Sequence, residues 1–407
     1  MALSYFYDKQ PQTAEGYKRI SMYLKTELIK YKSIVVFGSQ GMGVVIKNIL
    51  LSFGLNTSCF CDNSALVSDE NNQVPVYKPS DAAIKYPNAL YILSGVEPST
   101  CNSMKKQLKD IAPHAHYCFY DVIYYYYVSI NRNIDLNIFG LTLLNFFNDN
   151  SETNNAIHSL SFRITNKCTL KCKECAFLVP YQKEHYDFPI DDLISSLKTL
   201  CALSDGVLDL TINGGETFLY NDLFALLKEI VCIPRIINIV IVTNGTIVPS
   251  DDILKFCANN AIRIRISNYG QYSTKINELY NKCLSFNVSI SEFYRAQKWY
   301  SLGTMKHNRS DNENRSIADN CPFNGGKNKR ILGLYKGGVH ICDRYDGLLS
   351  CGCINKDSYS GLHYELSTGN RDSFSKFLLG ESLYKLCDMC NWPMETVTPA
   401  QQIEEIV

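Results

Sequence analysis

The sequence lacks net charge, a membrane-spanning segment and a secretory signal. Its 407 residues include 40 basic and 40 acidic side chains, so the formal net charge is zero. The electrostatic attraction that nucleic-acid and anionic-membrane binders use is therefore absent. No run approaches the roughly 18 apolar residues of a transmembrane helix, and the start, MALSYFYDKQ, lacks a basic and then an apolar region. We expect a cytoplasmic protein with no nucleic-acid and no membrane partner.

Histidine is also sparse, whereas cysteine is abundant. The seven histidines form no H-x3-H or HExxH pattern, so none is assigned a catalytic role. The 17 cysteines, in a chain without an export signal, predict metal binding or catalysis and not a disulfide framework. Nine of them fall in 168–175 and 321–390. The other eight lie among apolar neighbours and are interpreted as buried small hydrophobes: Cys59, Cys61, Cys101, Cys118, Cys201, Cys232, Cys257 and Cys283.

Residues 33–120 alternate between strand-like and helix-like segments, which predicts a parallel sheet with crossover helices. The strands are expected at 33–37, 57–61, 89–94 and 116–120. The first strand runs into the glycine cluster GSQGMG, and a helix follows.

The glycine cluster matches a nucleotide-binding Rossmann unit in part. Such a unit needs spaced glycines and an acidic residue about 20 positions later, and the candidates are Gly38, Gly41, Gly43 and Asp62. Gln40 stands where the pattern has its second glycine. The stretch, with FCDNS and VPVYKPS, resembles Rossmann-like domains of sugar and surface-polysaccharide biosynthesis proteins. Two interpretations stay open: a nucleotide or nucleotide-sugar site, and a scaffold or docking domain.

Two stretches separate this region from the rest of the chain. Residues 121–147 are rich in aromatic side chains, with four tyrosines at 124–127, and are expected to pack between domains. Residues 148–155 (NDNSETNN) contain no apolar residue and are interpreted as a linker. The predicted boundaries are 1–125 for the first domain, 126–156 for the connector and linker, 157–320 for the second domain and 321–407 for the third.

From residue 157 onward, strand-then-helix units repeat. The repeat predicts a parallel barrel or a partial one, with its site on the loops that follow the strands. The strands are expected at 159–164, 207–212, 237–242, 262–266 and 288–290.

Directly after the first of these strands, ITNKCTLKCKECAF carries Cys168, Cys172 and Cys175 in C-x3-C-x2-C spacing. Three thiolates on one short loop can bind three irons of a four-iron cluster and leave the fourth iron open. The competing interpretation is a structural zinc. Zinc usually takes four closed ligands and C-x2-C pairs, which the triplet matches poorly.

This loop and the segments after it resemble the radical S-adenosylmethionine superfamily. The C-x3-C-x2-C loop after the first barrel strand is that family's motif, and TINGGETFLY carries its glycine–glycine–glutamate motif. The resemblance covers about 157–300. It implies an α/β fold with a partial (β/α)6 barrel, a 4Fe–4S cluster on the three cysteines, and a glutamate at the amino group of S-adenosylmethionine. The residues that would bind this cofactor are Asn213, Gly214, Gly215, Glu216 and Asn244.

The fourth strand of the second domain alternates between isoleucines and polar residues. Positions 262, 264 and 266 are isoleucine, whereas Arg263, Arg265 and Ser267 share the other face. Because the outer face of such a barrel packs under helices, the polar set is expected to point inward. Given the resemblance, Arg265 and Ser267 would hold the carboxylate or ribose of the cofactor. The alternative is that the arginines form structural ion pairs.

The C-terminal cysteines resemble the small auxiliary-cluster domains, called SPASM and twitch, of many radical S-adenosylmethionine enzymes. The resemblance rests on a C-x15-G-x4-C opening and a final C-x2-C pair in LCDMCNW. It implies one auxiliary 4Fe–4S cluster on Cys321, Cys342, Cys387 and Cys390. A zinc site on the same residues is the alternative.

Two further expectations concern this region. Cys353 or Cys351 would replace one of these ligands or give a hydrogen atom to a substrate radical. Asp343, Arg344 and a loop at 304–320 are expected to be exposed, the loop being a substrate lid or disorder.

The resemblance implies an enzyme in which a 5′-deoxyadenosyl radical, formed from S-adenosylmethionine, takes a hydrogen atom from a substrate. An external one-electron reductant such as flavodoxin or ferredoxin would be its partner. The substrate is expected to be a sugar or nucleotide-linked sugar of carbohydrate biosynthesis, because of residues 33–120. Two alternatives stay open: a peptide-modifying enzyme and a non-catalytic iron–sulfur sensor.

Overall fold

The computed structural model describes most of the chain: residues 24, 27–64, 74–131, 145–146, 155–293, 299–301, 303–321, 331–379, 381–391 and 396–403. The chain divides into two compact units, Tyr17–Glu152 and, together, Met1–Gly16 and Thr153–Val407. The predicted linker 148–155 lies outside the described residues except for Asn155. This residue is buried and donates its Nδ2 to the carbonyl groups of Leu203 (3.1 Å) and Arg371 (3.2 Å). Asn155 therefore belongs to the packing of the second unit.

The unit Tyr17–Glu152 contains a five-stranded sheet of order β3-β2-β1-β4-β5, in which all neighbouring strands are parallel. Its elements are β1 (Ile34–Phe37), α2 (Met42–Ser52), β2 (Cys59–Cys61), β3 (Val76–Tyr77), α3 (Pro79–Lys85), β4 (Leu90–Leu93), α4 (Pro98–Ile111), β5 (His116–Phe119) and α5 (Tyr120–Asn131). The predicted parallel α/β architecture is confirmed, and β3 is a fifth strand that was not expected. The tyrosines at 124–127 lie within α5.

The second unit is built on an eight-stranded sheet of order β10-β9-β8-β7-β6-β12-β13-β14. The elements up to β11 are β6 (Ala156–Arg163), α7 (Ile190–Leu203), β7 (Gly206–Asn213), α8 (Leu223–Ile230), β8 (Ile236–Thr243), α9 (Asp251–Asn259), β9 (Ile262–Ser267), α10 (Ile276–Ser285), β10 (Ile290–Phe293) and β11 (Trp299–Tyr300). The later elements are α11 (Asp311–Asn320), β12 (Ile331–Tyr335), β13 (Gly338–His340), α12 (Tyr345–Ser350), β14 (His363–Glu365), α13 (Arg371–Leu379) and β15 (Thr396–Val397).

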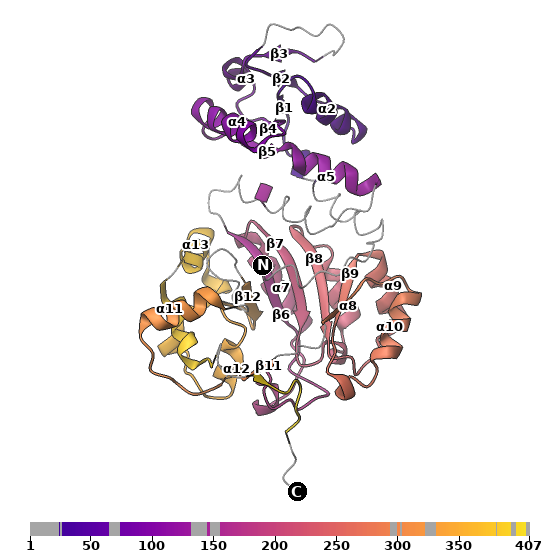
Figure 1. Ribbon diagram of the computed structural model, residues 1–407, viewed down its shortest axis with the longest axis vertical. Coiled ribbons are helices and arrows are strands. Elements are labelled where there is room, and N and C mark those ends of the chain that lie inside the picture. The colour runs from indigo at the N-terminus through magenta and orange to yellow at the C-terminus, as the bar shows by residue number, and fades with distance from the viewer. Residues whose placement is uncertain are drawn as a thin grey trace. The chain divides into compact units, whose positions relative to one another are not determined.

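Six strands of this sheet, from β10 to β12, run parallel, and β13 and β14 continue it as antiparallel strands. Five of the six come from the predicted strand-then-helix repeats, so the expected α/β class with a parallel sheet is confirmed. The sixth, β12, comes from the cysteine-rich region and pairs with the free side of β6, with Ile331 opposite Ser159. Helices α11, α12 and α13 gather at the β12 side of the sheet, and α9 and α10 at the β9 side (Figure 1).

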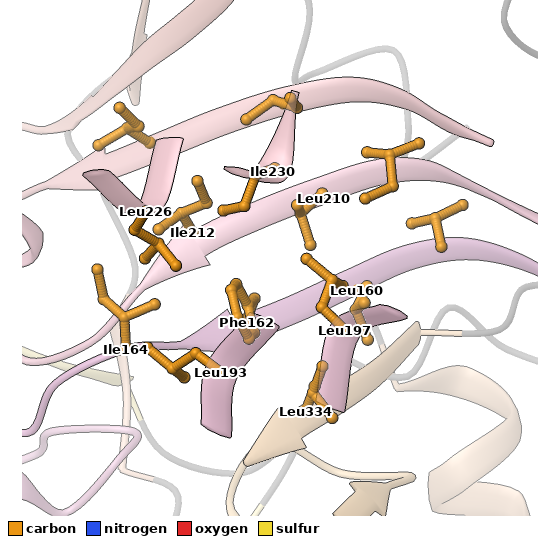
Figure 2. Packing of buried hydrophobic residues seen from close by; sticks show 14 of the residues in the cluster. Leu160, Phe162, Ile164, Leu193, Leu197, Leu210, Ile212, Leu226, Ile230 and Leu334 are labelled. Carbon is orange, nitrogen blue, oxygen red and sulfur yellow. The ribbon is translucent and has the colours of Figure 1, made fainter. Parts of the chain in front are cut away.

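One face of the sheet packs against helices α7 to α10. Phe162 of β6 and Leu210 of β7 lie among leucines of α7 and α8, such as Leu197 and Leu226 (Figure 2). The isoleucines of β9 are fully buried in the same cluster, as the alternation predicts. Arg263, Arg265 and Ser267 are half-buried on the opposite side. We call this opposite side the polar face of the sheet.

The expectation of a loop over 304–320 is wrong in its second half. Residues 311–320 form α11, which begins at a capping box: Ser310 Oγ accepts from Glu313 N, and the Glu313 carboxylate accepts from Ser310 N at 2.8 Å. This reciprocal pair satisfies two N–H groups that a helix start otherwise leaves unpaired. Among the residues that the structure describes, no helix combines the length and the apolar character needed to cross a bilayer.

Candidate functional site

The three cysteines of the first group lie on the loop that follows β6. Cys172 is buried, and Cys168 and Cys175 are half-buried. The loop turns tightly, because Cys175 N donates to Cys172 O (3.2 Å) and Leu178 N donates to Cys175 O (2.9 Å). Burial raises the pKa of Cys168 to about 12 and that of Cys172 to about 11, and the neighbouring thiols act in the same direction. Metal binding here must therefore displace protons.

Two side-chain amides donate to these sulfurs. Asn244 Nδ2 lies 3.8 Å from Cys168 Sγ, and Gln402 Nε2 lies 3.6 Å from Cys172 Sγ. Within the described part of the chain, no three His, Cys, Asp or Glu side chains converge on a point that could hold one metal ion. In an iron–sulfur cluster each cysteine binds a different iron, and three thiols with two N–H donors fit that arrangement.

The Gly214–Gly215 turn after β7 packs directly on the cysteine loop. Gly215 N donates to Thr165 O (3.1 Å), and Glu216 N donates to Lys167 O (2.7 Å). A Cβ on Gly215 would lie 2.2 Å from Lys167 O, and one on Gly214 would lie 2.5 Å from Thr165 O. Both glycines are therefore needed for this close approach of two backbones.

Glu216 connects the ends of β7 and β8. Its side chain is 1% exposed. Oε1 accepts from Phe218 N (3.1 Å) and Thr243 Oγ1 (2.8 Å), and Oε2 accepts from Asn244 N (2.8 Å). Burial raises the pKa of this carboxyl group, and the three hydrogen bonds act to lower it. Because a carboxylate offers about four acceptor positions, Glu216 retains one, on Oε2, for an ammonium group.

We expect Glu216→Ala to destabilise the second unit by about 2–4 kcal/mol, because the Thr243 hydroxyl and the Asn244 N–H would stay buried without an acceptor. Glu229→Ala is the matched control. Its carboxylate forms an exposed ion pair with Lys198 (3.4 Å), so its removal should cost less than about 0.5 kcal/mol. Denaturant unfolding of both variants measures the difference, and equal losses would contradict the structural role of Glu216.

Polar side chains gather on the polar face beside these loops. Asn213 Nδ2 donates to Ser161 Oγ (2.6 Å), and Ser161 also bonds the carboxylate of Asp343. Arg163 is 3% exposed and donates Nη2 to Asp343 O (2.8 Å), while its Nε and Nη1 have no partner within the described residues. Its guanidinium lies 4.1 Å from the ring centre of Phe177. Sequence reasoning missed Arg163 and Asp343, because only the long-range fold brings them together.

The expected exposure of Asp343 and Arg344 is wrong. These residues follow β13, which pairs with β12, and β12 in turn pairs with β6. This places Asp343 and Arg344 toward the interior of the unit. Arg344 is 7% exposed and donates to carbonyl groups of Gly303 and Met389. Burial raises the pKa of Asp343 to about 6, although Arg163, Ser161 and Arg265 act to lower it.

The other predicted residues of β9 have distinct surroundings. Arg265 lies close enough to Asp343 to influence its pKa. Arg263 lies 3.7 Å from Asp209 in an ion pair, so the structural alternative applies to this arginine. Ser267 hydrogen-bonds the hydroxyl of Tyr269.

The four C-terminal cysteines that were predicted as ligands lie near one another. Burial raises the pKa of Cys387, and Cys342, Cys321 and Cys390 are close enough to raise it further. Arg309 holds the 387–390 turn, because its Nη1 donates to Cys387 O (3.0 Å) and Cys390 O (2.9 Å). The structure thus brings together residues that are up to 69 positions apart along the chain.

Cys351 and Cys353 have separate surroundings. Cys351 Sγ lies 3.9 Å from Leu178 O, next to the first cysteine loop. Cys353 is exposed and lines a cavity of about 550 Å³ together with Lys306, Arg309 and Asp388. The lining of this cavity comes from residues 306–314, 353–359 and 385–388.

In the unit Tyr17–Glu152, the predicted nucleotide-binding glycines form a tight turn between β1 and α2. Gly38 (φ 107°) and Gly41 (φ 52°) adopt conformations that favour glycine. A Cβ on Gly43 would lie 1.9 Å from Gly38 O. All three glycines are thus explained by the path of the turn itself.

Asp62 at the end of β2 binds this turn. Its Oδ2 accepts from Ser39 N (2.9 Å) and Ser39 Oγ (2.8 Å), and its Oδ1 accepts from Ser64 N (3.0 Å) and Ser64 Oγ (2.7 Å). Burial acts to raise the pKa of Asp62, but these hydrogen bonds outweigh it and lower the pKa to about 2. The carboxylate is therefore engaged by the protein at the place where a Rossmann unit would bind a ribose.

Asp62→Asn is expected to destabilise this unit at pH 7, since an amide accepts these four bonds less well than a carboxylate. Because the folded-state pKa is below the ordinary 3.8, the contribution of the carboxylate is complete above about pH 4 and is lost as the pH falls through about 2. The difference in the free energy of unfolding between Asp62→Asn and wild type should be smaller at about pH 2.5 than at pH 7. Asp110→Asn, at an exposed position, is the control, and a difference independent of pH would refute the assignment.

Comparisons with known proteins give a partial match. No family model matches the chain. The GTP 3′,8-cyclases of Clostridium perfringens strains SM101 and 13 are each 29% identical over 152 residues, which is 33% of this chain and 45% of each relative. The chain thus spans less than half the length of these curated relatives.

Solved structures also match. The structure of BtrN with AdoMet and 2-DOIA is 14% identical and covers 61% of this chain and 97% of that one, with a TM-score of 0.37. Histidine-tagged anSMEcpe with AdoMet is 15% identical and covers 57% and 84%, with a TM-score of 0.33. SuiB of Streptococcus suis with S-adenosylmethionine is 14% identical and covers 60% and 72%, with a TM-score of 0.27.

Proposed function

We propose that this chain is an enzyme of the radical S-adenosylmethionine superfamily that removes a hydrogen atom from a sugar or a nucleotide-linked sugar. The match to the GTP 3′,8-cyclases supports the expected superfamily, and with it we propose a 4Fe–4S cluster and S-adenosylmethionine as cofactors. The single observation that carries the proposal is the packing of the Gly214–Gly215 turn on the cysteine loop. This packing places the Glu216 carboxylate and the three thiols of the cysteine loop beside the polar face of the sheet.

We assign the cluster to Cys168, Cys172 and Cys175. When bound, such a cluster supplies one electron for the reductive cleavage of S-adenosylmethionine. The chain supports this by placing N–H donors at two of the sulfurs and by burying Cys172. The remaining acceptor position of Glu216 suits the amino group of the cofactor. Arg265 and Ser267 are its proposed partners for the carboxylate or ribose.

The polar face supports a substrate rich in hydroxyl groups. Arg163, Asn213 and Asp343 offer both donors and acceptors on it, and Asn213 Oδ1 has no partner within the described residues. A sugar presents hydroxyl groups that both donate and accept, so it can pair with each of these groups. Their burial excludes water, which strengthens every such bond.

The C-terminal cysteines are proposed to hold one auxiliary 4Fe–4S cluster, with Cys321, Cys342, Cys387 and Cys390 as ligands. Their mutual proximity and the Arg309 bonds to the 387–390 turn support this assignment. Cys353 is proposed as a hydrogen donor, because it lines a cavity among C-terminal residues. An external reductant such as flavodoxin or ferredoxin would supply electrons.

The test is anaerobic incubation of reconstituted, reduced protein with S-adenosylmethionine. We expect 5′-deoxyadenosine to form, and deuterium from a labelled sugar pool to enter it. Deuterium from labelled peptides instead would favour a peptide-modifying enzyme. No 5′-deoxyadenosine under any reducing condition would overturn the proposal and favour a cluster-binding sensor.

A further inference from the structure

Residues 399–403, which we call the strap, run along the cysteine loop as an antiparallel partner. Lys173 N donates to Gln401 O (2.7 Å), and Ile403 N donates to Lys171 O (2.8 Å). Cys172 and Gln402 therefore lie opposite one another in an antiparallel bridge, although they are 230 positions apart in the chain. The strap is anchored just before it, where Val397 of β15 pairs with Trp299 of β11.

The side chain of Gln402 is fixed at both ends. Its Oε1 accepts from Lys171 N at 2.7 Å. Because a backbone N–H only donates, the oxygen must face Lys171, which leaves Nε2 facing Cys172 Sγ at 3.6 Å. The second hydrogen of Nε2 is directed to Ala400 O (2.6 Å), and Ala400 is fully buried. The amide therefore cannot turn away from the sulfur without losing two other hydrogen bonds.

We propose that Gln402 is a positioning residue that fixes Cys172 and raises the reduction potential of the metal cluster bound there. An electron added to a cluster increases the negative charge on its sulfurs, and an N–H directed at a sulfur stabilises that charge. The strap also covers Cys172, whose side chain is 8% exposed. This inference rests on the proposed function, since it needs a cluster on the triplet.

The first experiment compares Gln402→Leu with Gln401→Leu in full-length, reconstituted protein. Both substitutions remove one amide side chain, but the Gln401 side chain is exposed and this residue contributes its backbone carbonyl to the bridge. Redox titration followed by electron paramagnetic resonance measures the potential of the triplet cluster. We expect a more negative potential for Gln402→Leu and the wild-type value for Gln401→Leu. Identical potentials in all three proteins, or equal shifts in both variants, would overturn the proposal.

The second experiment needs no cluster and stays decisive if Gln402→Leu fails to fold. In metal-free protein, removal of residues 399–407 should increase the rate at which iodoacetamide labels Cys172 several-fold. Cys201 lies on α7 and is buried in the hydrophobic core of the second unit. Its labelling rate serves as the internal reference and should not change. An unchanged rate at Cys172 would show that the strap does not cover it. If the wild-type protein binds zinc in place of iron, the proposed function and the proposed effect of Gln402 on the reduction potential are both refuted. The labelling rate of Cys172 still shows whether the strap covers this residue.

Discussion

Cys172→Ala is expected to reduce formation of 5′-deoxyadenosine below detection and to remove the iron of one cluster. The substitution leaves two thiolates on the loop, and an open iron for S-adenosylmethionine requires three. Iron analysis and chromatography of the reduced reaction mixture measure both losses. The effect should be as large as that of removing Cys168 or Cys175, because each of these changes removes the electron source for cleavage.

The matched control for this loss is Cys232→Ala. Cys232 is exposed, and its Sγ lies 3.4 Å from Lys228 O within the same turn. Its iron content and its rate of cleavage should equal those of wild type. Normal cleavage by Cys172→Ala would mean that the triplet does not hold the catalytic cluster.

Cys387→Ala is expected to remove the iron of the second cluster while cleavage of S-adenosylmethionine continues without formation of product. The reason is that the cysteines that influence the pKa of Cys387 are Cys321, Cys342 and Cys390, and none of the triplet. The measurements are iron per protein and the ratio of 5′-deoxyadenosine to altered substrate. Loss of both clusters would show that the two cysteine groups are one site.

Cys353→Ala separates a ligand from a hydrogen donor in the same region. Cys353 is exposed on its cavity, so its removal should leave both clusters in place. Unchanged product would exclude it as a hydrogen donor, whereas loss of product with full iron content would assign it that role. Loss of iron would instead make it a ligand of the second cluster.

Local patterns predicted the sheet of the second unit well, and they failed where long-range contacts decide. The alternation in β9 correctly placed its isoleucines under the helices, because a strand's side-chain period is fixed by its geometry. Helix α11 was missed since residues 311–320 contain few apolar side chains. Its capping box, Ser310 with Glu313, was the available sequence pattern.

The candidate site was predictable only where a motif carries it. The cysteine triplet and the glycine–glycine–glutamate turn could be found by spacing, whereas the three bonds that occupy Glu216 could not. Asp343 reaches Arg163 from 180 positions away, and Gln402 reaches Cys172 from further still. No local pattern encodes such pairs. The roles of the cofactor-binding residues and the predicted domain boundaries stay predictions.

The pairing of β12 with β6 has a consequence for synthesis of the chain. The partner strand of β6 emerges about 170 residues after it, which at ~5–20 residues per second is roughly 10–30 s. During this interval one side of β6 has N–H and C=O groups without their final partners, and such an edge readily pairs with the wrong strand. Pairing of β12 with β6, with Ile331 opposite Ser159, closes this edge. A newborn chain stalled before residue 331 should therefore aggregate more readily than one released after residue 335.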